Sequence, residues 1–381
     1  MLSPLQAGRG KPPESGVAAY TGALATQIAS RTDLTILGQI GCSPDAAGRA
    51  TVLPTWTPDM RLAKQVNRTS RQLDVDLIHV QHEFNLYGGL LQGGLLTLRL
   101  MAMRRRGIRV VTTVHGVVPP SEVTPAFVRR NSLPNSVRLV RLGFRTAYRA
   151  ISASSDALVV HHEYFRKVLV ESYGVPAPKV HVIKPGLPVM ISSRGGGTRR
   201  EVLTLGFLTG YKLPELLVEV AESDLEPDTI FRFCVGLNPR IKDAAYVDRY
   251  KRLEERVRAL EARAIWSGYI ADDQLNDAFQ SAAMLILPYT ECVSASAVAA
   301  LAQHFSVPIC YSRPLRPLFG PGTLEFELEA ASLARAMHEA RTGSHTETSN
   351  ELFTSWETSA GDTVDLWNGL LESNAHRRRH S

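Results

Sequence analysis

Short apolar segments that alternate with helical segments constrain the fold of this chain more than any other feature of its sequence. The clearest are VDLIHV at 75–80 and IRVVTTV at 108–114, two largely apolar runs of strand length. Such strands are typical of parallel sheets, because helices cover both faces of a parallel sheet. Strands that alternate with helices form right-handed βαβ units. The sequence therefore predicts an α/β protein.

The alternation occurs in two blocks. We expect strands at 34–40, 51–53, 75–80, 108–114, 157–161 and 180–183 in the first block, and at 202–207, 230–235, 264–266, 284–287 and 307–311 in the second. The stretch SSRGGGT at 192–198 separates the blocks and is typical of a linker. We predict two doubly wound, Rossmann-like domains, residues 1–190 and 198–345, that face a central cleft. We also expect a short strand at the start of the chain, a long loop or short helical lid at 119–134, and helices that include those at about 90–105, 163–173 and 295–304. A helix at about 349–372 is expected to pack back on the first domain.

Hydropathy and cysteine spacing argue against membrane-spanning and disulfide-rich classes. No apolar run approaches the ~20 residues that span a bilayer, and no charged-then-apolar signal segment opens the sequence. The four cysteines, Cys42, Cys234, Cys292 and Cys310, show no CxxC spacing, so we expect reduced core or loop thiols. These features predict a cytoplasmic protein.

Basic residues are concentrated in one part of the chain. Residues 101–150 contain ten arginines and one acidic residue, Glu122, in a chain whose net charge is +6. No zinc-finger spacing or RNP-like aromatic run accompanies them, so we expect no nucleic-acid partner. Three alternatives stay open: peripheral contact of residues 104–149 with an anionic membrane, binding of a phosphorylated substrate, and ordinary solvated helix faces.

Open parallel sheets bind ligands beyond the carboxyl ends of their strands. The residues expected there are Gly16, His82, Glu83, His115 and Gly186 in the first block, and Lys212, Leu237, Asn238, Tyr269, Ile270 and the loop at 291–296 in the second. Two histidines, a carboxylate and a lysine suit a substrate that carries phosphates and hydroxyls. No HExxH or HxH spacing occurs, so we expect no protein-bound metal. His79 lies inside a strand and is expected to be structural.

The stretch at 282–308 has the sequence of an anion site. A strand is followed by a polar crossover at 288–292, by small residues, and by an alanine-rich helix that ends near His304. A helix N-terminus offers unpaired N–H groups and a partial positive charge, and Ser294 and Ser296 are suitable capping residues. The alternative is an ordinary strand–loop–helix unit with a serine cap.

The chain resembles the GT-B fold glycosyltransferases, in particular glycosyltransferase family 4, over nearly its whole length. The motifs that carry the resemblance are SPL…SGVAAY at 3–20, VDLIHVQHEF at 75–84 with Gly88 and Gly89, TTVHG at 112–116, KVHVIKPGLP at 179–188, LGFLTGYK at 205–212, SGYIADDQL at 267–275 and LILPYTE at 285–291. The VDLIHVQHEF motif is similar to that of one bacterial branch. The resemblance implies transfer of a sugar from a nucleotide diphosphate sugar, usually with retention and without a metal.

The resemblance also implies roles for individual residues. Lys212 would neutralise the diphosphate leaving group and His115 would contact the transferred sugar; with Glu83 they are the candidate catalytic residues. The candidate donor-binding residues are Gly16, Tyr269, Ile270, Glu291, Ser294, Ala295 and Ser296, and the candidate acceptor-binding residues are His82, Gly88 and Gly89. Backbone groups of Tyr269 and Ile270 would pair with the base, and amides near Ser294 and Ser296 would bind phosphate.

Two positions depart from the family pattern. Phe207 stands where the family commonly has an arginine. The family also has two glutamates with seven residues between them, and the matching positions here are Val293 and Leu301. The sequence SASA at 294–297 fits a variant in which a serine–small-residue turn replaces the first glutamate.

The leading hypothesis is a cytoplasmic, metal-independent glycosyltransferase that needs no cofactor and uses a UDP or GDP sugar. The acceptor would be a small molecule, a natural product or an envelope glycan or lipid precursor. One alternative is a degenerate GT-B protein that binds a nucleotide sugar or a partner enzyme without catalysis. Another is an epimerase of nucleotide sugars, which would need more acid–base carboxylates than we can place. The oligomeric state, including a homodimer, stays open.

Overall fold

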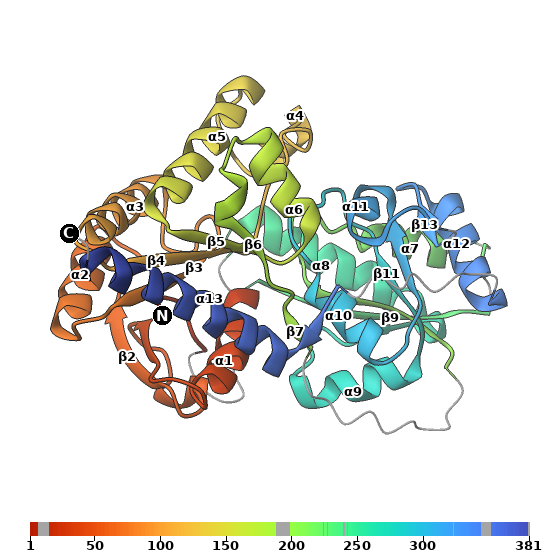
Figure 1. Ribbon diagram of the computed structural model, residues 1–381. Helices are drawn as coiled ribbons and strands as arrows, with labels where there is room; N and C mark the ends of the chain where they lie inside the picture. Colours follow the sequence, from red (N-terminus) through yellow and green to blue (C-terminus); the bar gives the residue numbers. More distant parts are fainter. Residues whose placement is uncertain are drawn as a thin grey trace. The chain divides into compact units, whose positions relative to one another are not determined.

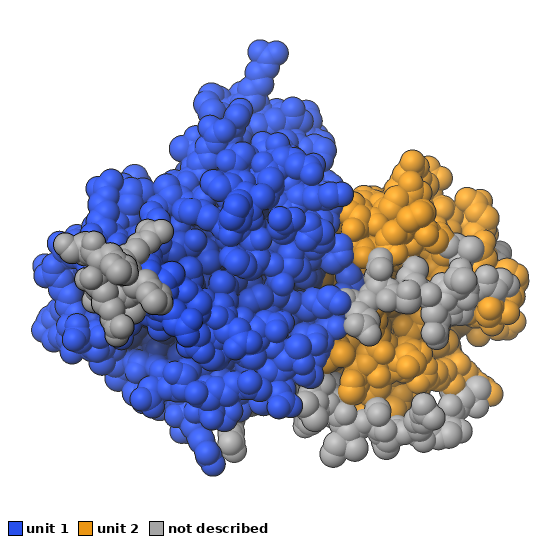
Figure 2. Space-filling view, viewed as in Figure 1, with its two compact units in different colours: residues 1–186, 293–295, 352–381 blue, residues 187–292, 296–351 orange. Residues whose placement is uncertain are grey.

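The computed structural model describes residues 1–6, 15–187, 199–223, 225–226, 228–238, 241, 243–322, 324–343 and 352–379. The chain forms two compact units, which are coloured separately in Figure 2. Unit 1 contains Met1–Gly186, Val293–Ala295 and Leu352–Ser381; unit 2 contains Leu187–Cys292 and Ser296–Glu351. The expected linker at 192–198 lies outside the described residues.

Unit 1 is built on parallel strands (Figure 1). Its larger sheet has the order β3-β4-β5-β6, formed by Leu77–His82, Arg109–Val114, Ala157–Val160 and Val180–Val182. A second sheet pairs β1 (Thr35–Gln39) with β2 (Thr51–Trp56). Leu2 forms parallel bridges to Leu37 and to Val80, so the N-terminal segment links β1 to β3. The short opening strand is therefore reduced to a single bridging residue.

The helices of unit 1 lie mostly in segments that the sequence predicts to be helical, with two additions. They are α1 (Gly16–Ile28), α2 (Leu62–Gln72), α3 (Leu90–Arg105), α4 (Pro125–Arg130), α5 (Val137–Ser154), α6 (Glu163–Lys167) and α13 (Trp356–Arg379). Sequence reasoning missed α2, whose segment is mostly polar, and gave α4 only as a loop or short helical lid. It also predicted one helix at 163–173, whereas α6 ends at Lys167 and continues as a wider π-type turn.

Unit 2 has one parallel sheet with the strand order β10-β9-β8-β11-β12-β13. These strands are Ala264–Trp266, Ile230–Gly236, Glu201–Phe207, Ala282–Leu287, Ile309–Ser312 and Glu325–Phe326. This is the order of a doubly wound Rossmann sheet, in which the chain reverses its direction of winding between the first and fourth strands. Here those strands are β8 and β11. The predicted α/β class with two Rossmann-like units is confirmed.

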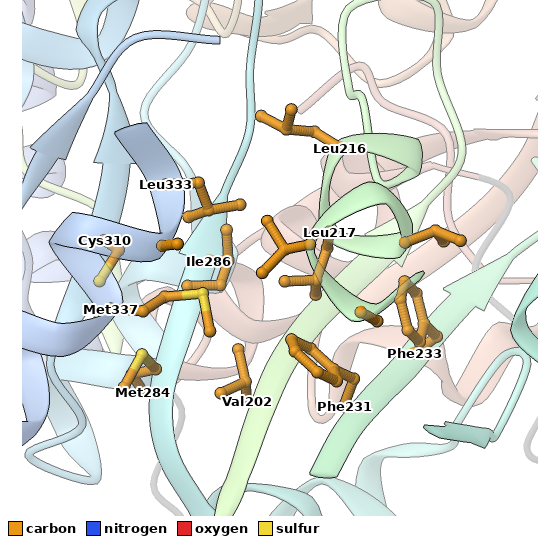
Figure 3. Packing of buried hydrophobic residues seen from close by; sticks show 14 of the residues in the cluster. Val202, Leu216, Leu217, Phe231, Phe233, Met284, Ile286, Cys310, Leu333 and Met337 are labelled. Carbon is orange, nitrogen blue, oxygen red and sulfur yellow. The ribbon is translucent and has the colours of Figure 1, made fainter. Parts of the chain in front are cut away.

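The core of unit 2 lies between its sheet and helices that include α7 (Glu215–Glu222) and α12 (Ala330–Thr342). Figure 3 shows side chains from neighbouring strands, among them Val202, Phe231 and Ile286, in contact with Leu217 and Met337 from these helices. The remaining helices are α8 (Ala244–Arg258), α9 (Asp272–Ser281), α10 (Ala297–His304) and α11 (Arg316–Phe319). The continuous apolar strands predicted from sequence are thus buried as expected.

Helix α13 belongs to the core of unit 1 although it follows unit 2 in the sequence. Trp367 is buried in this core, and its indole Nε1–H donates to Nδ1 of His79 at 3.2 Å. His79 is 2% exposed and also contacts the hydroxyl of Thr113 at 2.8 Å. His79 is therefore a structural histidine, as its position inside a strand predicted.

Replacing Trp367 should destabilise unit 1 strongly. We expect Trp367→Ala to lower the free energy of unfolding by ~3–5 kcal/mol, because it leaves a cavity and removes the donor to His79. Urea denaturation followed by circular dichroism measures this change. Asn368→Ala, at the exposed neighbouring position, is the control and should have little effect. Equal stability of the two variants would contradict the packing described for α13.

Candidate functional site

The carboxyl ends of β8 and β11 form the candidate site of unit 2. A small pocket at these ends is lined by Gly206, Phe207, Lys212, Val235 and Tyr289. Because β8 and β11 are the strands between which the winding reverses, this is the edge where doubly wound sheets bind ligands. Lys212, the candidate catalytic residue of this unit, lies in it.

The loop that carries Lys212 is held against the crossover that follows β11. Lys212 forms an antiparallel bridge with Tyr289, and the N–H of Thr290 donates to the C=O of Tyr211 at 2.8 Å. Nζ of Lys212 lies 5.2 Å from the centroid of the Tyr289 ring. No carboxylate among the described residues forms an ion pair with Lys212, and burial lowers its pKa. A desolvated cation without a counter-ion favours an anionic ligand.

Gly206 makes room for this lysine. Its φ is +119°, in the region that favours glycine, and a Cβ added there would lie 2.7 Å from Nζ of Lys212. The ammonium group therefore lies against bare backbone at the end of β8. A side chain at position 206 would displace it.

Helix α8 fixes the same loop through two residues that sequence reasoning missed. Arg249 donates to the C=O of Lys212 at 2.7 Å and to the C=O of Thr209 at 2.9 Å, and it pairs with Glu215 at 2.6 Å. The hydroxyl of Tyr246 donates to the C=O of Leu208 at 2.8 Å. These hydrogen bonds hold the backbone on both sides of Lys212, so Arg249 and Tyr246 are positioning residues.

Tyr269 forms an aromatic stack at the end of the sheet. Its ring lies parallel to that of Phe207, with the centroids 5.6 Å apart, and the Tyr269 residue is 40% exposed. Gly236 makes this stack fit, because a Cβ there would lie 3.0 Å from Cβ of Tyr269. Ile270 follows and is half-buried. Phe207, at the position where the family commonly has an arginine, thus forms an aromatic platform with Tyr269.

The predicted phosphate-binding turn before α10 is divided between the units. Ser296 belongs to unit 2 and caps α10, accepting the N–H of Ala299 at 3.4 Å. Ser294 and Ala295 group with unit 1, in which the C=O of Val293 accepts the N–H of Val117 at 2.8 Å. Helix α10 begins at Ala297, two residues after the expected start. Glu291 lies before the turn in unit 2 and is 4% exposed.

Three histidines follow the strands of unit 1 at the carboxyl edge of its sheet. His82 ends β3, His115 follows β4 and His161 follows β5. The N–H of His115 donates to the C=O of His82 at 2.9 Å, and Nδ1 of His115 lies 3.2 Å from Nε2 of His161. Sequence reasoning did not select His161, although its position after ALVV matches that of His115 after its own strand.

The partners of these imidazoles define their tautomers. Nδ1 of His161 lies 2.9 Å from the C=O of Ile183, which can only accept, so this nitrogen carries a proton. Burial lowers the pKa of His161 to about 4, so its Nε2 is unprotonated at neutral pH and faces Nδ1 of His115 as an acceptor. Burial and the neighbouring imidazoles hold the pKa of His115 well below its ordinary value. Nε2 of His115 lies 2.8 Å from Oε1 of the Gln81 side chain.

Helix α1 connects Gly16 to this histidine pair. Ser15 caps the helix by accepting the N–H of Ala18, and a Cβ added at Gly16 would meet open space. One turn later, the ring of Tyr20 packs edge-on against the ring of His115, with the ring centroids 4.8 Å apart. The centroid of the His161 ring lies 5.0 Å from that of Tyr20. Gly16 and His115 therefore belong to one packed arrangement.

The remaining acceptor candidates follow β3. His82 is half-buried, with its pKa lowered to about 4 by burial, and Glu83 is exposed. Gly88 has φ +101°, and a Cβ there would lie 2.9 Å from the C=O of Pro58. Gly89 is the N-cap of α3. The glycines are thus explained by backbone geometry, and their role toward an acceptor stays a prediction.

The structure therefore forms two groups of predicted residues. Unit 2 brings Lys212 beside the crossover that leads to Glu291. Tyr269 stacks on Phe207, which lines the same pocket as Lys212. Unit 1 brings Gly16, His82 and His115 together at one sheet edge. The functional roles of all these residues remain predictions.

Comparison with known proteins is consistent with this geometry. Residues 15–189 match the family model described as Glycosyltransferase Family 4. A segment of 153 residues, 36% of this chain, is 30% identical to mannosylfructose-phosphate synthase of Agrobacterium fabrum and spans 33% of that protein. The match thus covers about a third of the length of this curated relative.

Solved structures resemble the chain over nearly its whole length. A glycosyltransferase from Rickettsia africae has a TM-score of 0.65 at 14% identity, covering 97% of this chain and 98% of its own. HepE of Anabaena, in complex with UDP and glucose, has a TM-score of 0.65 at 15% identity, covering 96% and 98%. Sucrose-phosphate synthase from Thermosynechococcus elongatus has a TM-score of 0.60 at 17% identity, covering 96% and 92%. At these identities the likeness concerns the fold, which is GT-B.

Substituting Gly206 should weaken anion binding without unfolding unit 2. In Gly206→Ala the new methyl group displaces the Lys212 ammonium, so we expect the dissociation constant for inorganic pyrophosphate to rise about tenfold or more, the loss of a charge-assisted contact. Isothermal titration calorimetry measures it. Gly320→Ala is the matched control, because Gly320 also has positive φ (+77°) but open space around its Cβ position. An equal loss of pyrophosphate affinity in both variants would contradict the position assigned to the Lys212 ammonium group.

The buried histidines should make stability depend on pH. The unfolded state takes up protons below about pH 6.5, but folded His161 does so only near its lowered pKa of about 4. The contribution of His161 to the free energy of unfolding is therefore fully present above pH 6.5 and is lost as the pH drops toward 4. His161→Asn should reduce this slope by about 1.4 kcal/mol per pH unit. Urea denaturation between pH 7 and 5 tests this, with exposed His338→Asn as control; an unchanged slope in His161→Asn would count against the tautomer assignment.

Proposed function

We propose, on the premise that this chain is a GT4-type glycosyltransferase with the GT-B fold, that it transfers a sugar from a nucleotide diphosphate sugar to an acceptor. Unit 2 would bind the donor and unit 1 the acceptor. We further propose that the reaction retains the anomeric configuration, moves a hexosyl group and needs no protein-bound metal.

The half-buried Lys212 is the observation that carries the proposal. It is a cation without an ion-pair partner among the described residues, it lies at the carboxyl edge of a Rossmann sheet, and Arg249 and Gly206 determine its position. The leaving group of a nucleotide sugar is a diphosphate, whose negative charge grows as the glycosidic bond breaks. A preorganised ammonium group stabilises that charge more in the transition state than in the ground state.

The proposed step balances without an additional reagent. The bond between the anomeric carbon and the diphosphate oxygen breaks, and a bond from the acceptor oxygen to the same carbon forms. The acceptor proton passes to an oxygen of the departing diphosphate, which remains on the same face as the entering nucleophile. Lys212 and the N-terminus of α10, capped by Ser296, would neutralise the diphosphate in place of a metal ion.

The aromatic stack is the proposed binding site of the donor base. Phe207 and Tyr269 offer a partly exposed platform, and the backbone of Tyr269 and Ile270 follows it. HepE of Anabaena is described in complex with UDP, so uridine is the first base to test and guanosine the second.

Unit 1 supplies neutral groups suited to a hydroxylated ligand. The lowered pKa of His115 keeps its imidazole neutral at neutral pH, with Tyr20 packed against the ring and His82 on the adjacent strand. A neutral imidazole can form a hydrogen bond with a sugar hydroxyl, and it does not repel the positive charge that develops on the transferred sugar. Glu83, exposed at the same edge, is the proposed carboxylate of this part of the site.

Replacing Lys212 should abolish transfer and spare the fold. We expect Lys212→Ala to weaken UDP binding about 10–100-fold, equivalent to ~1.5–3 kcal/mol for a hydrogen bond to a charged group, and to lower turnover of the responding nucleotide sugar further. A thermal-shift screen with UDP, GDP, ADP, CMP and dTDP identifies the base, and release of the nucleoside diphosphate measures turnover. Lys251→Ala, an exposed lysine of α8, is the control.

The outcomes separate the candidate functions. Loss of both binding and turnover in Lys212→Ala, with both retained in Lys251→Ala, supports the proposal. Nucleotide binding by the unmodified chain, without turnover of any donor tried with hydroxylated acceptors, would favour a non-catalytic nucleotide-sugar binder. Unchanged turnover in Lys212→Ala would remove this lysine from the site.

A further inference from the structure

Helix α3 exposes an uninterrupted apolar stripe. Leu91, Leu95 and Leu98 are spaced i, i+4 and i+7, so they lie on one face of the helix. Leu91 is 72% exposed and Leu98 is 63% exposed, and Leu90 at the helix start is 86% exposed. Single exposed leucines are common, but a stripe of them on one helix indicates an interaction surface.

Helix α5 also exposes leucines. Leu139 is 62% exposed and Leu142 is 59% exposed, one turn apart on the outer face. Helices α3 and α5 contact each other within unit 1 (Figure 1). Both connect successive parallel strands and therefore run in the same direction, and Arg104 near the end of α3 donates to the C=O of Ala153 near the end of α5. The hydrogen bond places the C-terminal ends of the two helices together, and the leucines of each helix lie on its exposed face.

Arginines accompany the leucines. Arg138 and Arg145 are exposed on α5, and neither forms an ion pair with any residue that the structure describes. We call this surface the leucine–arginine face, and it consists of Leu91, Leu95, Leu98, Leu139, Leu142, Arg138 and Arg145. The combination of unpaired cations and uncovered apolar side chains is the defining property of the face.

We propose that the leucine–arginine face docks unit 1 on an anionic lipid bilayer. Helices that lie in the plane of a membrane interface insert apolar side chains below the headgroups while their basic residues attract anionic lipids. Nucleic acid would use the arginines but offers nothing comparable to the leucine stripe. Within the described residues, no helix is long and apolar enough to cross a membrane, so the contact is peripheral.

The face also adjoins the candidate acceptor residues. Gly89 is the N-cap of α3, and Leu90 and Leu91 follow it directly. The bilayer would therefore lie next to the loop that leaves His82, and an acceptor carried by a lipid would reach this edge without leaving the membrane. The link to a lipid-borne acceptor rests on the proposed function, whereas the docking itself does not.

Cosedimentation of the full chain with vesicles tests the docking. We expect binding to phosphatidylcholine vesicles that contain about 30% phosphatidylglycerol, weak binding to phosphatidylcholine alone, and loss of binding near 0.5 M salt. Arg138→Glu/Arg145→Glu should weaken binding at least ~25-fold, from roughly fivefold for each basic residue lost. Leu91→Gln/Leu98→Gln should weaken it even at low salt, because the leucines contribute by insertion.

Matched variants on unit 2 serve as controls. Lys251→Glu/Arg252→Glu reverses two exposed charges on α8, and Leu225→Gln replaces a leucine that is 49% exposed; both should bind vesicles like the unmodified chain. Unchanged melting temperature and UDP response in every variant would separate lost docking from lost folding or lost donor binding. Equal pelleting of all variants, or a dimer that the leucine substitutions dissociate without any vesicle binding, would overturn the proposal.

Discussion

The parallel arrangement of the strands is the constraint on which the rest of this structure depends. A parallel strand must be followed by a crossover to the opposite end of the sheet, so every strand of a unit ends at the same edge. In unit 2 the chain leaves β8 and β11 toward opposite sides, and the space between their ends receives Lys212. In unit 1 the same rule places His82, His115 and His161 on three adjacent strands, although they are far apart in sequence. Neither group requires a local sequence motif.

The fold was predictable where local pattern and tertiary environment agree. Helix α3 has the predicted bounds, and β3 and β4 fall within two residues of theirs. The two strands are buried as their apolar runs indicate. Helix α2 was missed because its polar segment is held by only a few buried residues, among them Leu62 and Val66. The helix expected at 163–173 forms, but its winding changes from α to π after Lys167, which local propensity does not reveal.

The residues of the candidate site also divide into those that the sequence could predict and those that it could not. Lys212 and His115 could be selected from sequence, because polar residues directly after buried strands must lie at the ligand-binding edge. Arg249 could not, since it reaches the Lys212 loop from a helix 37 positions away and is one arginine among several on that helix. His161 carried a usable signal, its place at a strand end, but its value depends on Ile183 and on the tautomer that this carbonyl imposes. The grouping of Ser294 and Ala295 with unit 1 had no sequence signal at all.

The placement of α13 has a consequence for synthesis on the ribosome. Unit 1 is discontinuous, and nearly all of unit 2 is translated between its main part and the helix that carries Trp367. While unit 2 emerges from the exit tunnel, the surface around His79 that Trp367 will cover is still open to solvent. Unit 2 can complete its own core during this interval, but the core of unit 1 still lacks Trp367. The nascent chain thus has an obligatory order of maturation, in which the domain that begins first is finished last.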